Sequence, residues 1–90
     1  MRHFSWSSEK NAKLIEDRGI SFERIVIMLN RQDFLDIIEH PNQNKYPGQS
    51  MFIIEMDGYC YLVPFVENEN EVFLKTIILS RKATKKYLEK

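Results

Sequence analysis

Apolar and polar residues follow two different periods in the first third of the chain. Phe4 and Trp6 alternate with polar neighbours, which is typical of a short strand over residues 3–6. Over residues 22–29 the apolar side chains instead recur at helical spacing, at Phe22, Ile25, Val26 and Leu29. A weaker helical stripe covers residues 9–18. The pattern predicts a strand followed by two helices, and the short break between the helices indicates an αα-hairpin.

Small polar residues and a glycine mark the ends of these two helices. Ser7 or Ser8 offers an N-cap for the first helix, and Ser21 offers one for the second. Gly19 occupies the position at which a left-handed residue commonly ends a helix. The helices are therefore expected to end within a residue or two of the apolar stripes.

Four further strands are predicted in the rest of the chain. They comprise residues 34–39, 50–56, 59–66 and 72–79. Asp57-Gly58 separates the second of these from the third and favours a two-residue type I′ hairpin turn. The strand over residues 59–66 is apolar on both faces, which indicates a central strand covered on both sides. Pro64 within it indicates a bulge or a strand end.

The element order β-α-α-β-β-β-β-α predicts an α+β domain that comprises residues 1–90. We expect an antiparallel sheet of four to five strands, with the αα-hairpin packed over one face. Ser80 is expected to cap a short C-terminal helix, and this helix is expected at an edge or end of the sheet.

Composition narrows the class of protein. A chain of 90 residues with 43% hydrophobic residues forms one domain with a core, and it does not match the composition of disordered chains. Cys60 is the one cysteine and lies in an apolar run, so we expect a buried thiol without a disulfide. With two histidines far apart in sequence, no metal site is expected, and no cofactor motif is present. The start of the chain does not resemble a signal peptide and no apolar run could span a membrane, so a cytoplasmic protein without membrane contact is expected.

Positive charge is concentrated near the C-terminus, although the formal net charge of the chain is zero. The six basic residues after position 74 are Lys75, Arg81, Lys82, Lys85, Lys86 and Lys90. Arg81 and Lys82 fall in the first turn of the predicted helix, where free N–H groups and the helix dipole already favour an anion. Cations at this position indicate an external anion, for which phosphate is the obvious candidate. The remaining lysines of the helix are expected to face solvent or a partner.

The loop over residues 40–49 is the longest irregular segment and supplies further candidate groups. His40 follows a strand, where it could act as a general acid or base, although an ordinary surface histidine before a proline fits equally well. Lys45 could hold a phosphate and Tyr46 could stack on a base, and Tyr46 as a simple loop anchor stays open. Gln49 closes the loop and is a further candidate for holding substrate.

Lys75 is predicted to share a strand face with Phe73 and Ile77, which are both apolar. A lysine on such a face either extends its ammonium group to solvent or points into a polar cleft.

RNA cleavage would suit these candidate polar and basic residues as a group, because the 2′-hydroxyl of RNA is its own nucleophile. An enzyme then needs only an acid, a base and cations on the developing phosphorane, without a metal.

Several segments together resemble the BrnT-like toxins, which are RelE/ParE-fold members of bacterial type II toxin–antitoxin systems. They are Phe4-Ser5-Trp6 with Lys10-Asn11, Arg18 to Glu23, His40-Pro41-Asn42 with Lys45 to Gln49, Phe73 to Ile78, and Ser80 to Thr84. The chain departs from the better-known members at Ser7, where they carry Asp, and in the loop of residues 40–49.

The resemblance implies a metal-independent ribonuclease that cleaves mRNA and arrests growth, with RNA and a DNA-binding antitoxin as partners. It would reach operator DNA only through the antitoxin. In this reading His40, Lys75 and Arg81 carry the chemistry, whereas substrate is held by Lys45, Tyr46, Gln49, Ser80 and Lys82. The alternative is a non-enzymatic binding module of the same fold, which would poison gyrase or act with the antitoxin as a co-repressor.

Overall fold

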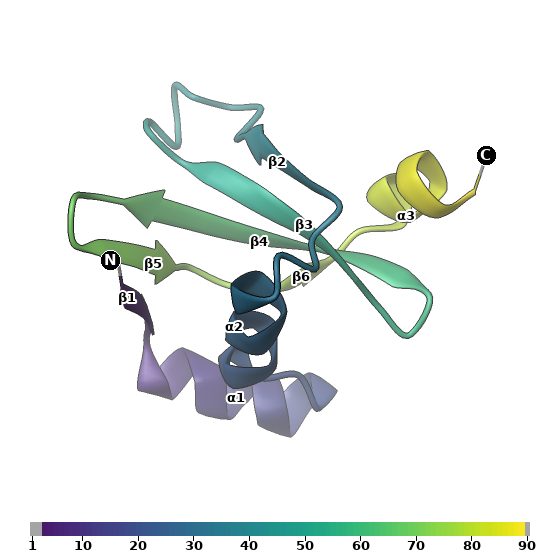
Figure 1. The fold of residues 1–90 in the computed structure, drawn as a ribbon, viewed down its shortest axis with the longest axis horizontal. Helices are drawn as coiled ribbons and strands as arrows, with labels where there is room; N and C mark the ends of the chain where they lie inside the picture. The colour runs from purple at the N-terminus through teal and green to yellow at the C-terminus, as the bar shows by residue number, and fades with distance from the viewer. Residues whose placement is uncertain (1–2, 90) are drawn as a thin grey trace.

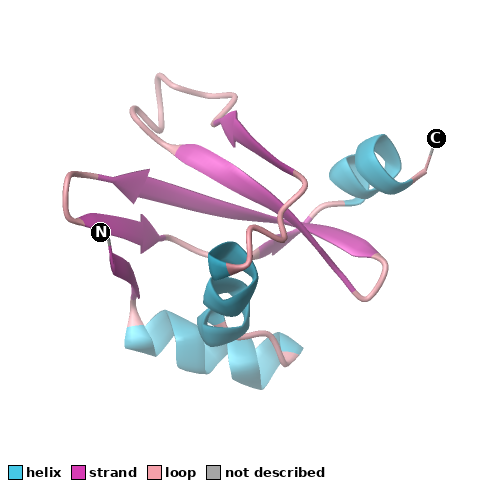
Figure 2. Ribbon diagram, in the orientation of Figure 1, coloured by secondary structure: helices cyan, strands magenta, loops and turns pink. Residues whose placement is uncertain are grey.

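A computed structural model describes residues 3–89, and Lys90 of the basic C-terminal run lies outside them. It contains three helices and six strands in one mixed α+β fold (Figure 1, Figure 2). The elements are β1 (His3–Trp6), α1 (Ser8–Arg18), α2 (Phe22–Asn30), β2 (Asp36–Glu39), β3 (Ser50–Met56), β4 (Tyr59–Glu67), β5 (Glu71–Leu74), β6 (Ile78–Leu79) and α3 (Arg81–Leu88). No helix in this part of the chain is long and apolar enough to cross a membrane.

The strands form a single sheet in the order β1-β5-β4-β3-β2, with β6 paired to β4 beyond the end of β5. All pairings are antiparallel except that of β1 with β5, which is parallel. The expectation of a purely antiparallel sheet was therefore wrong at this edge. Alternation of apolar residues looks the same in both directions along a strand, so it cannot give a strand's orientation.

The two faces of the sheet carry separate apolar clusters. The larger cluster joins α1 and α2 to one face, and at its centre Phe22, Ile25, Ile54, Val63 and Leu74 are fully buried. The smaller cluster joins Ile53 and Cys60 to Ala83 of α3 on the opposite face. β4 is thus covered on both sides as predicted, and Cys60 is buried. The C-terminal helix, expected at an edge or end of the sheet, packs on this opposite face near the β3–β4 turn through its small residues Ala83 and Thr84.

The strand predicted over residues 72–79 is interrupted opposite Pro64. β4 continues through Pro64, but its pairing with β5 and its pairing with β6 differ in register by one residue, which defines a bulge at residues 75–77. Lys75 N–H donates to the Pro64 carbonyl at 2.8 Å. In a regular antiparallel pair the other residue would donate its own N–H in return, but proline has none, so this second bond to Lys75 is missing. Because of the bulge, Lys75 and Ile77 lie on different faces of the sheet, so the prediction that they share one was wrong. Ile77 is buried in the cluster with α1 and α2, whereas Lys75 is exposed near Phe73 on the other face.

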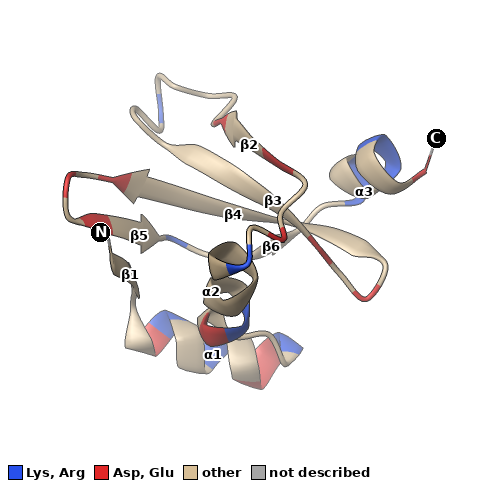
Figure 3. Ribbon diagram, in the orientation of Figure 1, with Lys and Arg blue, Asp and Glu red and all other residues tan. Residues whose placement is uncertain are grey.

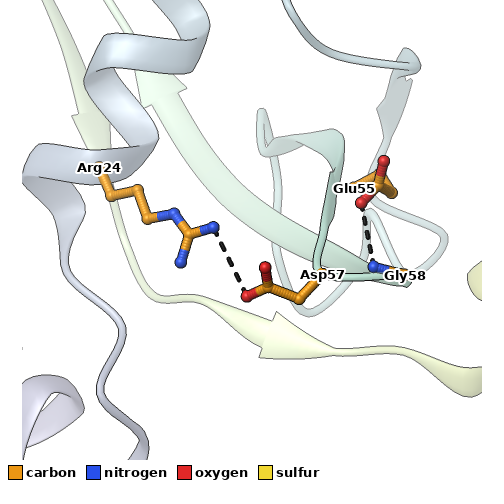
Figure 4. A network of polar contacts seen from close by, with 4 residues as sticks. All are labelled: Arg24, Glu55, Asp57 and Gly58. Carbon is orange, nitrogen blue, oxygen red and sulfur yellow. Dashed lines mark hydrogen bonds and ion pairs between the residues drawn. The ribbon is translucent and has the colours of Figure 1, made fainter.

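Local signals in the sequence are confirmed in detail. Asp57 and Gly58 both have positive φ, 56° and 87°, and join β3 to β4. Figure 4 shows this turn, in which Gly58 N–H donates to Glu55 Oε2 at 3.1 Å and Arg24 of α2 forms an ion pair of 3.5 Å with Asp57. The N-caps are Ser7, Ser21 and Ser80, and Gly19 ends α1 with φ of 67°.

Thr84 is the polar link between α3 and the sheet. Its hydroxyl accepts a hydrogen bond from the Cys60 N–H at 2.8 Å and donates one to the Ser80 carbonyl at 2.8 Å. Replacing Thr84 with Val keeps the shape but leaves the buried Cys60 N–H without a partner, which we expect to cost about 1–3 kcal/mol in the free energy of unfolding. Chemical denaturation measures this loss. Thr84→Ser retains the hydroxyl and serves as the control, and equal destabilisation by both variants would contradict this role.

Candidate functional site

The face of the sheet opposite α1 and α2 is only partly covered by α3. Strand register brings Ile38, Met51, Pro64 and Lys75 into one row on this face. The neighbouring row includes His40, whose N–H donates to the Gln49 carbonyl at 2.9 Å, and Phe73, which pairs with Val66. These two rows lie toward the loop of residues 40–49, whereas α3 covers the rows that contain Ile53 and Cys60.

A groove of about 230 Å³ lies between α3 and the end of β2. It is lined by Ile38, Pro41, Met51, Ile53, Leu62, Ser80, Lys82, Ala83, Lys86 and Tyr87. Its floor is therefore apolar and comes from the sheet, whereas Lys82 and Lys86 add positive charge along the helix side. Figure 3 shows the basic residues along α3 and the acidic residues at the distant β4–β5 connection.

The predicted site residues are spread over this face. Ser80 and Lys82 line the groove, and Pro41 beside His40 lines its other end. Lys75 lies across the sheet from Ile38 by three strand spacings, which is about 14 Å. Arg81 is exposed at the start of α3 and does not line the groove. The structure therefore places cations around the face and does not bring His40, Lys75 and Arg81 into mutual contact.

His40 and Tyr46 form an aromatic pair at one end of the face. Their ring centroids are 4.3 Å apart, and the Lys45 ammonium lies 5.4 Å from the centroid of the Tyr46 ring. The Asn42 N–H donates to His40 Nδ1 at 3.1 Å. An acceptor at Nδ1 requires the neutral ring to carry its proton on Nε2, so Nε2–H is free to donate a hydrogen bond toward this face.

The loop that carries this pair is built by two amides that the sequence reading did not single out. Gln43 Nε2 donates to the carbonyls of His40 and Gln49, at 2.8 and 3.0 Å, and Gln43 Oε1 accepts from Gly48 N–H at 3.1 Å. Asn42 Oδ1 accepts from Lys45 N–H at 3.1 Å. The Asn after a proline was the available signal, because Asn side chains commonly close turns by binding nearby backbone. The bonds of Gln43 cross the loop and leave no short-range signature.

The start of α3 retains the features expected of an anion site. Ser80 Oγ accepts from the Ala83 N–H at 3.1 Å, and the first turn of the helix contains no acidic residue. The N–H groups of Arg81 and Lys82 precede the first N–H that bonds to a carbonyl of the helix start, which is that of Thr84 to Ser80. The helix dipole and the two side chains therefore favour a negative ligand at the same place.

Tyr87 ties the end of α3 to β2, which the sequence reading did not anticipate. Its hydroxyl donates to Asp36 Oδ2 at 2.7 Å across 51 residues of chain. The hydrogen bond from Tyr87, and after it that from the Ile37 N–H, lowers the pKa of Asp36. The same bond to Asp36 is the largest cause that raises the pKa of Tyr87. Tyr87 also lines the groove beside α3.

This contact predicts a pH-dependent attachment of α3. The stabilisation from ionised Asp36 is present above its ordinary pKa of about 3.9 and is lost as the pH falls through the lower folded value. The stabilisation from neutral Tyr87 is present below about pH 10 and is lost as the pH rises through the raised value. We expect Tyr87→Phe to lower the thermal unfolding midpoint near pH 7, with a gap from the unchanged protein that narrows at both extremes. A gap that stays constant from pH 3 to 11 would contradict the assignment, and Tyr59→Phe, an exposed tyrosine, is the control.

Within residues 3–89 no three His, Cys, Asp or Glu side chains gather as a metal site would require. A scan of protein-family models finds no match, and searches of curated proteins and of solved structures also find none.

Proposed function

We propose that this chain is a BrnT-like toxin of a bacterial type II toxin–antitoxin system and acts as a metal-independent endoribonuclease. The observation that carries the proposal is the partly open sheet face, which combines an apolar floor with cations at Lys45, Lys75 and Lys82. Apolar and aromatic surfaces stack bases, and cations around them hold phosphates, so this face suits single-stranded RNA.

The arrangement of the elements supports the proposal. A strand, two helices and then a series of mainly antiparallel strands with a short C-terminal helix is the order that RelE/ParE-like resemblance implies. In this interpretation α1 and α2 form the αα-hairpin over one face, which leaves the opposite face for substrate. The partner would be a DNA-binding antitoxin, through which the pair would reach operator DNA in the cytoplasm.

His40 would act on a reacting oxygen through Nε2, because Nδ1 accepts from the Asn42 N–H at 3.1 Å. As general base its neutral ring would take the proton of the attacking 2′-hydroxyl, and as general acid its protonated ring would give a proton to the leaving 5′-oxygen, with water making the other proton transfer. Either role requires the Asn42 contact to open, because Nδ1 carries a proton in both. Lys75 and Arg81 would stabilise the charge on phosphate, and Lys45, Tyr46, Gln49, Ser80 and Lys82 would hold the RNA.

The spread of the cations favours a second candidate function. His40 and Lys75 lie at opposite sides of the face, which suits an extended ligand better than a compact reaction centre. A non-enzymatic toxin on the same fold, which binds gyrase or another target, would use the same surface. It would arrest growth without cleaving RNA.

Induced expression in bacteria, followed by an RNA assay with purified protein and EDTA, separates the two functions. We expect growth arrest, fragmented mRNA in the cells and RNA cleavage in vitro that EDTA does not inhibit. Growth arrest with intact mRNA and DNA damage would instead favour the binding module. Harmless expression of folded protein together with intact RNA, with and without ribosomes, would contradict both.

A further inference from the structure

The outer edge of β6 is unpaired. β1 occupies the neighbouring position in the sheet only beside β5, and the chain leaves the sheet after Trp6 to form α1. Ser80 N–H donates to the Cys60 carbonyl at 3.0 Å, and alternate residues of a strand direct their backbone groups to opposite sides. The N–H and C=O of Leu79 therefore point away from β4. Neither group forms a hydrogen bond within the described part of the chain.

Two hollows follow this free edge. One, of about 420 Å³, is lined by Arg18, Ile20, Tyr61, Ile78 and Leu79. The other, of about 190 Å³, is lined by Lys10, Lys13, Leu14, Asp17, Arg18, Thr76, Ile77 and Ile78. They share Arg18 and Ile78 and so lie next to each other between α1 and the strand edge, and we call the two together the β6 groove. Ile78 and Leu79 beside it are 43% and 40% exposed, high values for such side chains.

The charge of the β6 groove is mainly positive. Lys10, Lys13 and Arg18 line it, against the single acid Asp17. Among residues 3–89 an ion pair joins Arg24 to Asp57, but none of the three cations that line the β6 groove forms an ion pair. We propose that the β6 groove binds an extended, acidic segment of a partner protein, which adds to the sheet as a strand beside β6.

Three features select this kind of ligand. Unpaired backbone donors and acceptors at a strand edge are matched by another peptide backbone. Side chains of an added strand that point to the α1 face would lie beside Leu79 and reach the cations of α1, and the alternate ones would lie beside Ile78 on the other face. An acidic segment would satisfy those cations. The β6 groove lies on the α1 side of the molecule and is separate from the groove beside α3, so this proposal does not rest on RNA cleavage.

Binding of short labelled peptides to the full chain tests the proposal. The probes are a fluorescein-labelled peptide of alternating Glu and Val and its counterpart of alternating Lys and Val, followed by fluorescence anisotropy. We expect the acidic peptide to bind more tightly than the basic one and to weaken with added salt. Leu79→Pro removes the outward N–H without touching the β4 ladder and should weaken binding about tenfold. Arg18→Glu should weaken it by a similar factor, whereas Lys85→Glu on α3 should leave it unchanged.

Hydrogen exchange at Leu79 provides a readout that does not depend on any variant. The acidic peptide should slow exchange of the Leu79 amide, since this amide would enter a new strand pairing. Equal binding of the two peptides, absence of binding, or unchanged exchange at Leu79 would overturn the proposal. Protection of Leu79 by a second copy of the chain at high concentration, or by oligouridylate, would overturn it as well, because the occupant would then be another molecule.

Discussion

Replacing Phe22 with Ala is expected to cause the largest loss of stability of any single substitution considered for this chain. The Phe22 side chain is fully buried, and its ring lies 5.8 Å from that of Trp6 in a stacked pair. It therefore links β1 to the first residue of α2 within the main apolar cluster. Truncation of a buried Phe to Ala costs about 3–5 kcal/mol, a large part of the roughly 5–15 kcal/mol that stabilises a small domain.

Urea denaturation measures this effect, with Ile27→Ala as the matched control. Ile27 lies on the same helix but is 55% exposed, so its truncation should change the free energy of unfolding by no more than about 0.5 kcal/mol. The Phe22→Ala protein should unfold at a much lower urea concentration or be unfolded without denaturant. Similar midpoints for the two variants would contradict the assignment of Phe22 to the centre of the core.

Replacing His40 with Ala is expected to have the largest effect on activity if the chain cleaves RNA as proposed. A positioned general acid or base contributes about 100- to 10,000-fold to a rate, so cleavage should fall by a factor in this range. RNA binding should weaken less than cleavage, because Lys45, Lys75 and Lys82 remain. The half-buried His40 ring lies in a surface loop, so the variant should keep the fold.

His3→Ala is the matched control for this prediction. His3 is exposed at the start of β1 and is the other histidine of the chain. Single-turnover cleavage of a labelled oligonucleotide in EDTA measures both variants, and circular dichroism checks that each is folded. Retention of full activity by a folded His40→Ala protein, or an equal loss in His3→Ala, would remove His40 from the mechanism.

Features of the fold that depend on neighbouring residues could be predicted from the sequence. Ser21 and Ser80 cap their helices because a hydroxyl just before a helix reaches a free N–H two or three residues later. Asp57-Gly58 forms the expected turn because both positions require positive φ, which Gly readily adopts and Asp tolerates. In each case the physical cause lies within about four residues of the chain.

Features that depend on distant segments could not be predicted in the same way. The break between β5 and β6 lies opposite Pro64 of β4, which has no N–H to offer the neighbouring strand. β4 itself continues through the proline. The place of α3 is set by the bonds of Thr84 to Cys60 and of Tyr87 to Asp36, which join residues 24 and 51 positions apart. No spacing in the sequence specifies such pairs.

The candidate site was predictable by residue type but not by arrangement. The sequence indicated a polyanionic ligand through the histidine, lysine and tyrosine of the loop of residues 40–49 and the basic residues near Ser80. The structure places Ser80 and Lys82 beside the same groove. The amides that shape the loop were missed because Gln43 acts across six residues. The distance between Lys75 and the loop depends on strand order, which the sequence pattern does not contain.

The measurement that tests the central proposal most directly is a map of where RNA touches the protein. A short oligouridylate that contains 4-thiouridine, irradiated with the purified chain and analysed by mass spectrometry, identifies the contacted residues. We predict crosslinks on the face that carries Tyr46, Phe73 and Tyr87, with few on α1 and α2. Crosslinks confined to α1 and α2, or none at concentrations that saturate binding, would contradict the assignment of this face to RNA.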